Sequence, residues 1–138
     1  MSDVRELWVN RSDYRKTKPV TSARAPLKPG EVRVAIDKFA ITSNNVSYAI
    51  SGDAIGYWRF FPAEDGWGKV TVWGFGDVIE SQSDDIAVGE RLYGFFPMAS
   101  EAVLTVGRVK DDFFMDASPH RADLAAVYNQ YRRLAGEP

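Results

Sequence analysis

Residues 70–79 read Val-Thr-Val-Trp-Gly-Phe-Gly-Asp-Val-Ile, and this stretch is the most informative part of the sequence about the fold. Apolar residues alternate from Val70 and Val72 onward, which is the period of two expected of a half-buried strand. Gly74 and Gly76 interrupt the apolar pattern, and glycines inside a strand indicate a bulge or the corner of a barrel. The stretch therefore predicts a bent strand in a small barrel.

Four further strands are predicted on either side of the bent one. Alternation of apolar and polar residues predicts a strand at 31–41, and apolar runs between turns predict strands at 91–96 and 102–109. Residues 5–10 read as a first strand. Residues 11–30 hold three prolines and read as an irregular crossing. Short strands separated by turns predict a mainly β domain built around a barrel.

Helices are expected in two places. Polar side chains that can cap a helix predict a short one at residues 44–51, which Gly52 would end. Ser118 can cap a second helix at 119–135, where apolar residues recur at helical spacing. The apolar stripe of that helix, from Leu124 to Leu134, would either cover the barrel or lead into another domain.

Composition bounds the class of protein. The chain has 138 residues, which predicts one domain, and 45% are hydrophobic, which predicts a packed core. A formal net charge of −2 supplies no basic field for nucleic acid. No signal peptide pattern and no run of about 18 apolar residues is present, so we expect a cytoplasmic protein without a membrane partner.

The basic residues near the amino terminus have a simple interpretation. Residues 1–33 hold eight Lys and Arg residues, and four of them are close together in the sequence, namely Arg11, Arg15, Lys16 and Lys18. Charges of this kind discourage a strand from pairing with other molecules. They predict a solvated strand edge.

Several kinds of reactive site are excluded. The sequence has no cysteine, and His120 is its one histidine, so a transition-metal site is not expected. Ser118 and Asp123 would share the first turn of the predicted helix with His120 and could not converge on one reacting carbon. The acidic pairs at 64–65 and 84–85 read as polar turns. Gly74-Phe75-Gly76 lacks the third glycine and the following helix of a dinucleotide fingerprint.

One group of residues has the character of a binding site. Asn44, Asn45 and Tyr48 lie on the short predicted helix, next to an aromatic loop. The aromatic residues of interest in that loop are Tyr57, Trp58, Phe60 and Phe61. Polar groups that converge with aromatic rings are typical of a small-molecule site. Packing of both tyrosines, with their hydroxyls bonded to backbone groups, explains the pattern equally well.

Two motifs carry a family resemblance. Residues 29–34 read Pro-Gly-Glu-Val-Arg-Val and residues 88–94 read Val-Gly-Glu-Arg-Leu-Tyr-Gly, with the glycine-bent strand between them. This order resembles the amino-terminal domain of the medium-chain dehydrogenase/reductase superfamily. The resemblance implies a GroES-like, partly open barrel over about residues 27–109. The motifs Asn-Asn at 44–45 and Phe-Phe-Pro-Ala at 60–63 look like a poorly characterised bacterial branch of that superfamily.

The resemblance also implies an activity. The chain lacks the zinc ligands of the superfamily, so it is similar to the zinc-free quinone and enoyl reductases. Complete members carry a Rossmann-type domain that binds NADPH, and 138 residues leave no room for it. We therefore expect no cofactor site in this chain. The resemblance makes it the substrate-side domain of an NADPH-dependent reductase, inactive alone, that binds a small apolar or conjugated carbonyl substrate.

Roles for the candidate residues follow from the same resemblance. Tyr48, which is favoured, or Tyr57 would donate a proton or orient the substrate oxygen. Asn44 and Asn45 would bind substrate, and three aromatic residues would wall a dry cleft, namely Trp58, Phe60 and Phe61. The degraded Pro-Gly-x-Glu-x-x-Gly stretch before the bent strand departs from the family pattern.

A second hypothesis involves no chemistry. The barrel would then be a stand-alone module that binds a small ligand, or that forms a homo-oligomer through the stripe from Leu124 to Leu134.

Overall fold

The computed structural model describes most of the chain. The described residues are 3–40, 57–64, 66–107, 109–121, 124 and 126–134. The strands are β1 (Asp3–Asn10), β2 (Asp13–Ala23), β3 (Glu31–Phe39), β4 (Trp67–Lys69), β5 (Thr71–Ser81), β6 (Arg91–Pro97), β7 (Glu101–Gly107), β8 (Phe113–Asp116) and β9 (Gln130–Arg133). Three short 3₁₀ helices are η1 (Tyr57–Arg59), η2 (Pro119–Arg121) and η3 (Ala126–Asn129). The mainly β class predicted from the sequence is confirmed.

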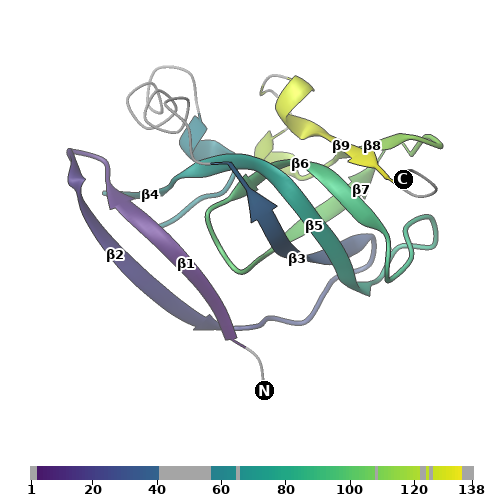
Figure 1. Cartoon of the computed structure of the whole chain (residues 1–138), viewed down its shortest axis with the longest axis horizontal. Helices are drawn as coiled ribbons and strands as arrows, with labels where there is room; N and C mark the ends of the chain where they lie inside the picture. Colours follow the sequence, from purple (N-terminus) through teal and green to yellow (C-terminus); the bar gives the residue numbers. More distant parts are fainter. Residues whose placement is uncertain are drawn as a thin grey trace.

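Six strands close into an antiparallel barrel in the order β3-β5-β6-β9-β8-β7, with β7 pairing back to β3. The barrel is therefore closed, whereas the sequence predicted a partly open one over residues 27–109. The difference comes from β8 and β9, which lie beyond residue 109 and fill the gap between β6 and β7. Figure 1 shows these two strands completing the barrel at the end of the chain.

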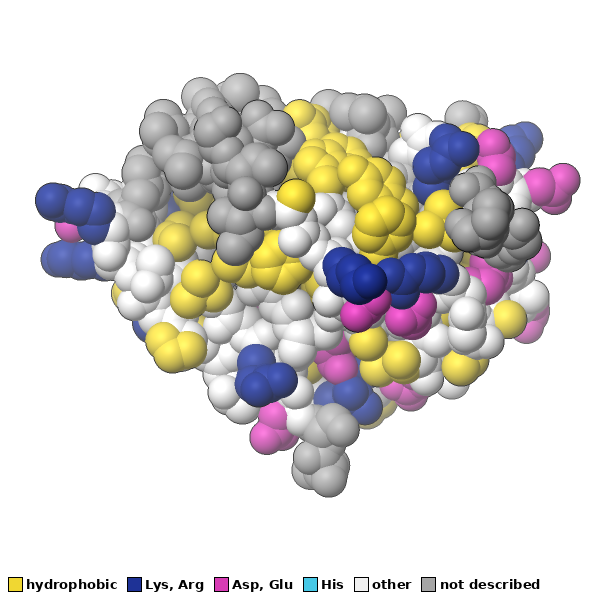
Figure 2. All heavy atoms as spheres, viewed as in Figure 1, with side chains coloured by type: hydrophobic (Ala, Val, Ile, Leu, Met, Phe, Trp, Pro, Cys, Tyr) yellow, Lys and Arg dark blue, Asp and Glu magenta, His cyan; other side chains and the backbone are white. Residues whose placement is uncertain are grey.

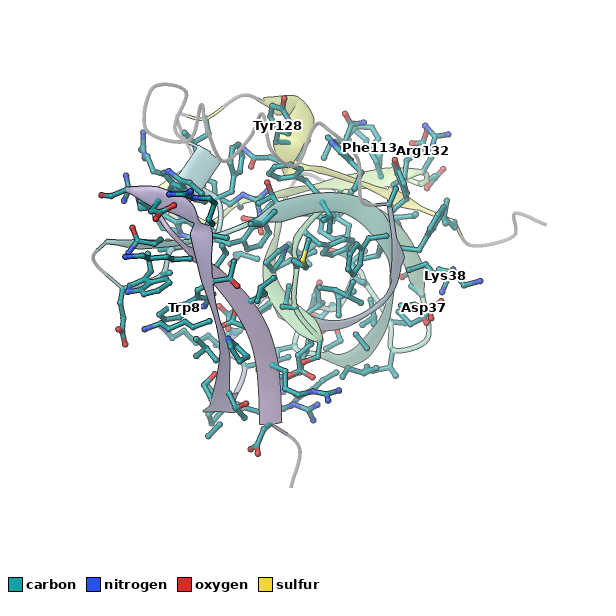
Figure 3. All side chains as sticks on the ribbon, turned by 60° about the vertical axis from the view of Figure 1, so that its left-hand side comes forward. Trp8, Asp37, Lys38, Phe113, Tyr128 and Arg132 are labelled. Atoms are coloured by element: carbon teal, nitrogen blue, oxygen red, sulfur yellow. The ribbon has the colours of Figure 1, made fainter. Side chains whose placement is uncertain are left out.

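Inward-facing side chains fill the barrel. Val32, Val34, Leu92, Phe96 and Tyr131 are among the fully buried residues of this core. Figure 3 looks into the barrel and shows side chains packed across its interior. The apolar residues of the alternating pattern are therefore the ones on the strand face that points into the barrel.

The glycines of the bent strand keep the interior from overcrowding. At Gly76 a Cβ atom would lie 2.5 Å from Cγ1 of Val34, and at Gly74 it would lie 2.3 Å from the carbonyl oxygen of Lys38. The pairing of β3 with β5 also shifts register beside them, between Ile36 and Lys38. The strand predicted at residues 70–79 is confirmed as part of β5, and the residue left unpaired at this shift is Asp37 of β3. Gly74 and Gly76 let β3 approach β5 closely.

The predicted helix at 119–135 is wrong. Its described residues form η2, η3 and then β9, a barrel strand that pairs with β6 and β8. Tyr131 accounts for the difference, because its ring is fully buried against Phe96 and Phe114 and lies beside Gly94. Burial of this large ring in the barrel outweighs the helical spacing of the local sequence. The short helix predicted at 44–51 lies outside the described residues.

A second, three-stranded sheet in the order β2-β1-β4 lies beside the barrel. Backbone hydrogen bonds join it to the barrel, since Leu7 donates to the Met98 carbonyl and Ser100 donates to the Arg5 carbonyl. Strand β1 confirms the prediction at 5–10, but β2 replaces the irregular crossing expected from residue 11 onward. The attached sheet leaves a space between itself and the barrel.

Strand β2 forms one edge of this sheet. Arg15 and Lys16 are exposed on it, in agreement with the predicted solvated edge. Lys18 instead places its ammonium group 5.4 Å from the ring centre of Trp8 and 4.2 Å from that of Trp67. This cation–π contact fastens the edge strand to its neighbours.

Candidate functional site

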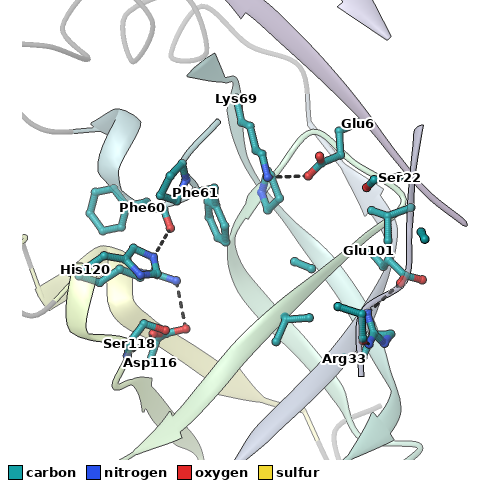
Figure 4. Close-up of a pocket in the computed structure, with 18 residues that line it drawn as sticks. Glu6, Ser22, Arg33, Phe60, Phe61, Lys69, Glu101, Asp116, Ser118 and His120 are labelled. Carbon is teal, nitrogen blue, oxygen red and sulfur yellow. Dashed lines mark hydrogen bonds and ion pairs between the residues drawn. The ribbon is translucent and has the colours of Figure 1, made fainter. Parts of the chain in front are cut away.

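A cavity of about 330 Å³ lies between the amino-terminal sheet and the barrel. That volume is within the range of small-molecule sites. Glu6 and Ser22 line it from the sheet, and Arg33 and Glu101 line it from the barrel. Figure 4 shows this cavity, which we call the sheet–barrel cavity.

Phe60 and Phe61 provide an apolar wall of the sheet–barrel cavity, and Pro62 continues it. The ring of Phe60 is held by edge contacts to Phe95, with 5.2 Å between ring centres, and to Tyr128, at 5.4 Å. These contacts fix the backbone that carries Phe61, so the wall is preorganised.

The rings behind Phe60 belong to an aromatic cluster on the outer face of the barrel. Trp73 contacts Tyr93, Phe95 and Tyr128, and Tyr93 also contacts Phe75. Figure 2 shows hydrophobic side chains gathered in a band on this face, bordered by Lys, Arg, Asp and Glu. The cluster anchors the segment that carries the predicted aromatic wall.

The turn after β8 supplies the polar side of the same wall. His120 Nε2 lies 3.1 Å from the carbonyl oxygen of Phe60, so this ring nitrogen donates to that oxygen. Arg121 is buried and pairs with Asp116 at 3.2 Å. Arg121 also donates to the hydroxyl of Tyr131, and burial raises the pKa of that hydroxyl far above its ordinary value. The wall is therefore tied to the barrel core through Arg121.

A second buried ion network borders the cavity on the barrel side. Glu101 accepts two hydrogen bonds from Arg24, of 2.8 and 2.6 Å, and one of 3.2 Å from Arg33. Arg33 also donates a hydrogen bond of 2.9 Å to Glu80 and another to the carbonyl oxygen of Ala25. The hydrogen bonds that Arg24 donates to Glu101 raise the pKa of Arg24. This network binds the segment between β2 and β3 to the barrel.

An ion pair from the amino-terminal sheet faces this network. Lys69 Nζ lies 2.6 Å from Oε2 of Glu6, and both side chains are largely buried. Strand pairing explains the contact, since Lys69 lies opposite Trp8 in the β1–β4 ladder and Glu6 is two residues from Trp8, on the same face of β1. The sequence alone does not reveal this pair. Opposite charges that face each other across a ladder become recognisable only once the pairing of the three-residue β4 is known.

The structure describes part of the predicted site. Phe60 and Phe61 both line the cavity, whereas the buried Trp58 packs with Val9 and Val70 in a separate small core. Tyr57 begins η1, and its side chain is not among those described. The remaining predicted residues, Asn44, Asn45 and Tyr48, lie outside the described residues.

Comparison with known families gives one result. The family model described as "Protein of unknown function (DUF2855)" matches residues 39–138, which is well over half of the chain. The chain belongs to the DUF2855 family. The match begins at the last residue of β3 and includes every later strand, so the DUF2855 region supplies Phe60, Phe61, Lys69 and His120 to the cavity. No curated protein matches the chain.

The described residues of this DUF2855 chain set limits on other kinds of site. No group of three or more His, Asp or Glu side chains among them is arranged to hold a metal ion. No helix in the described part of the chain is long and apolar enough to cross a membrane. The sheet–barrel cavity is thus the feature on which we base a function.

Proposed function

We propose that this chain is the substrate-side domain of a zinc-free, NADPH-dependent reductase similar to the medium-chain family, and that it needs a separate nucleotide-binding domain for activity. The observation that carries the proposal is that Phe60 and Phe61, expected to wall a substrate cleft, line a cavity of about 330 Å³. Apolar walls with a few polar groups suit a small substrate.

The described residues do not fit a dinucleotide. A phosphate cradle needs a glycine-rich turn that opens a helix. Gly74 and Gly76 instead lie within β5, where a Cβ atom would collide with β3. We therefore assign no hydride step to this chain.

The share of this domain in the reaction is to bind the acceptor and exclude water. Phe61 and Pro62 supply apolar surface, and the hydrogen bond of His120 to Phe60 keeps that surface against the barrel. A site with little water strengthens the electrostatic interactions made inside it. Proton donation by Tyr48 or Tyr57 stays a prediction.

The cavity alone would also suit a stand-alone binding module, which is the second candidate function. Formation of a homo-oligomer also stays a prediction. The helical stripe proposed as its interface is not formed, because Tyr131 of that stripe is buried inside the barrel.

Titration of ¹⁵N-labelled protein tests the main proposal. We expect 2-cyclohexen-1-one, a small conjugated ketone, to shift the backbone amide signals of residues 60–61, 118 and 120–121. We expect NADPH to shift none of the signals. Micromolar binding of NADPH would overturn the assignment of the cofactor to another domain.

Variants locate the binding. Phe61→Ala should weaken cyclohexenone binding at least fivefold, because it removes most of one apolar wall. Phe39→Ala is the matched control, since Phe39 is exposed and does not line the cavity. Equal affinities of the two variants would contradict a ligand site in the cavity.

A further inference from the structure

The charges around the sheet–barrel cavity cancel. Lys69 pairs with Glu6, Arg121 pairs with Asp116, and Glu101 lies between two arginines. The full set of cations in these pairs is Lys69, Arg24, Arg33 and Arg121, and the anions are Glu6, Glu80, Glu101 and Asp116. A charged ligand would lose hydration here without meeting a surplus of opposite charge in these pairs. The walls therefore favour an uncharged ligand.

Each guanidinium nitrogen of the two buried arginines already donates a hydrogen bond within the protein. Arg33 donates to Glu80, Glu101 and the Ala25 carbonyl. Arg121 donates to Asn129, to the Tyr131 hydroxyl and to the Tyr128 carbonyl. A ligand that bound either guanidinium would have to share nitrogens that already hold parts of the fold together.

Lys69 is different. An ammonium group has three N–H donors. Among the described residues, Glu6 is the one acceptor bonded to the Lys69 ammonium, so two donors remain. The Lys69 side chain is 17% exposed, and it lines the cavity together with Phe61. In Figure 4 Phe61 lies between Lys69 and His120. A ligand in the cavity would meet an unused donor at Lys69 and an aromatic ring at Phe61.

We propose that the sheet–barrel cavity binds an uncharged small molecule with an accepting oxygen, such as a ketone, ester or amide. The oxygen accepts a hydrogen bond from Lys69, and the apolar body packs against Phe61 and Pro97. Glu6 keeps Lys69 in place and repels carboxylates. This inference rests on the proposed function, because it names the ligand class and the binding residue for the same cavity.

Three probes of similar size test the inference by titration of ¹⁵N-labelled protein. Acetophenone has the accepting oxygen, toluene lacks it, and benzoate carries a charge. In the unaltered protein, benzoate should bind at least tenfold more weakly than acetophenone. In the double variant Lys69→Met/Glu6→Gln, which removes the donor and leaves no unpaired charge, acetophenone should lose about tenfold in affinity. Toluene should bind this variant as it binds the unaltered protein.

The remaining outcomes separate the explanations. Lys69→Arg keeps a donor and should retain acetophenone binding within about threefold, and Lys16→Met, on the exposed edge of β2, should change nothing. Equal losses for acetophenone and toluene would overturn the role of Lys69 and leave the substrate-side function standing. Benzoate binding as tight as acetophenone would overturn the preference for uncharged ligands. If neither acetophenone nor toluene shifts the amide signals of residues 60–61, the proposed function and this inference both fail.

Discussion

A single methyl group added at position 94 tests whether residues 130–133 form a strand of the barrel. In Gly94→Ala the new Cβ atom would lie 2.4 Å from Cδ1 and 2.8 Å from Cε1 of Tyr131. Ordinary contact begins at 3.4 Å, so the ring would have to retreat by about 1 Å. It cannot do so freely, because its hydroxyl bonds to Arg121 and to Phe95 and its face stacks on Phe114.

We expect Gly94→Ala to lower the free energy of unfolding by about 2 to 3 kcal/mol, the upper part of the range for overpacking a core. In urea unfolding followed by circular dichroism, this loss lowers the midpoint by about 1 M or more. In a Tyr131→Leu background the same substitution should cost less than about 1 kcal/mol, because the ring is gone. An unchanged midpoint for Gly94→Ala in the unaltered chain would refute the packing of Tyr131 on β6.

Two further predictions concern ion pairs. Glu101→Gln should lower the free energy of unfolding, measured in urea, by about 3 kcal/mol, because it leaves the buried Arg33 with Glu80 as its remaining acidic partner. Asp13→Asn, at the exposed pair with Arg15, is the control and should cost less than about 1 kcal/mol. A similar cost for both variants would show that the Glu101 network adds no stability. Burial raises the pKa of Glu90, but hydrogen bonds from Arg133 and from the Ala87 amide outweigh it and lower that pKa below its ordinary value of 4.5. The stabilising effect of Glu90 is therefore present above pH 4.5 and is lost as the pH falls through the lowered pKa. The difference in unfolding free energy between the unaltered chain and Glu90→Gln should shrink from pH 7 to pH 3. A constant difference over this range would contradict the pair with Arg133.

Local alternation predicts the strands whose two faces differ. Val32 and Val34 are buried in the barrel core, and Arg33 between them lies on the other face of the strand, where it pairs with Glu80 and Glu101. The apolar and charged residues therefore alternate, which is why the strand at 31–41 is predicted well. Strand β2 escapes prediction because it is an edge strand, where charged residues and even Pro19 are tolerated. A pattern of polar residues with a proline reads as irregular until its partner is known.

Barrel closure depends on a contact that no local pattern contains. Tyr131 and Leu134 recur at helical spacing, and the space that receives Tyr131 exists because residue 94, far away in the sequence, is glycine. The ion pair of Lys69 with Glu6 cannot be predicted for a similar reason, since the two residues come together only through the pairing of β1 with β4. The aromatic loop is predictable because aromatic residues crowd into a stretch without periodicity, and Phe60 and Phe61 do line the cavity.

The most direct test of the central claim, that the sheet–barrel cavity binds ligand, is a crystal structure of the chain soaked with acetophenone. We predict that the ring of acetophenone packs on Phe61 and that its oxygen lies within hydrogen-bonding distance of Lys69 Nζ. Acetophenone bound elsewhere on the molecule, with the cavity unfilled at saturating concentration, would contradict the account.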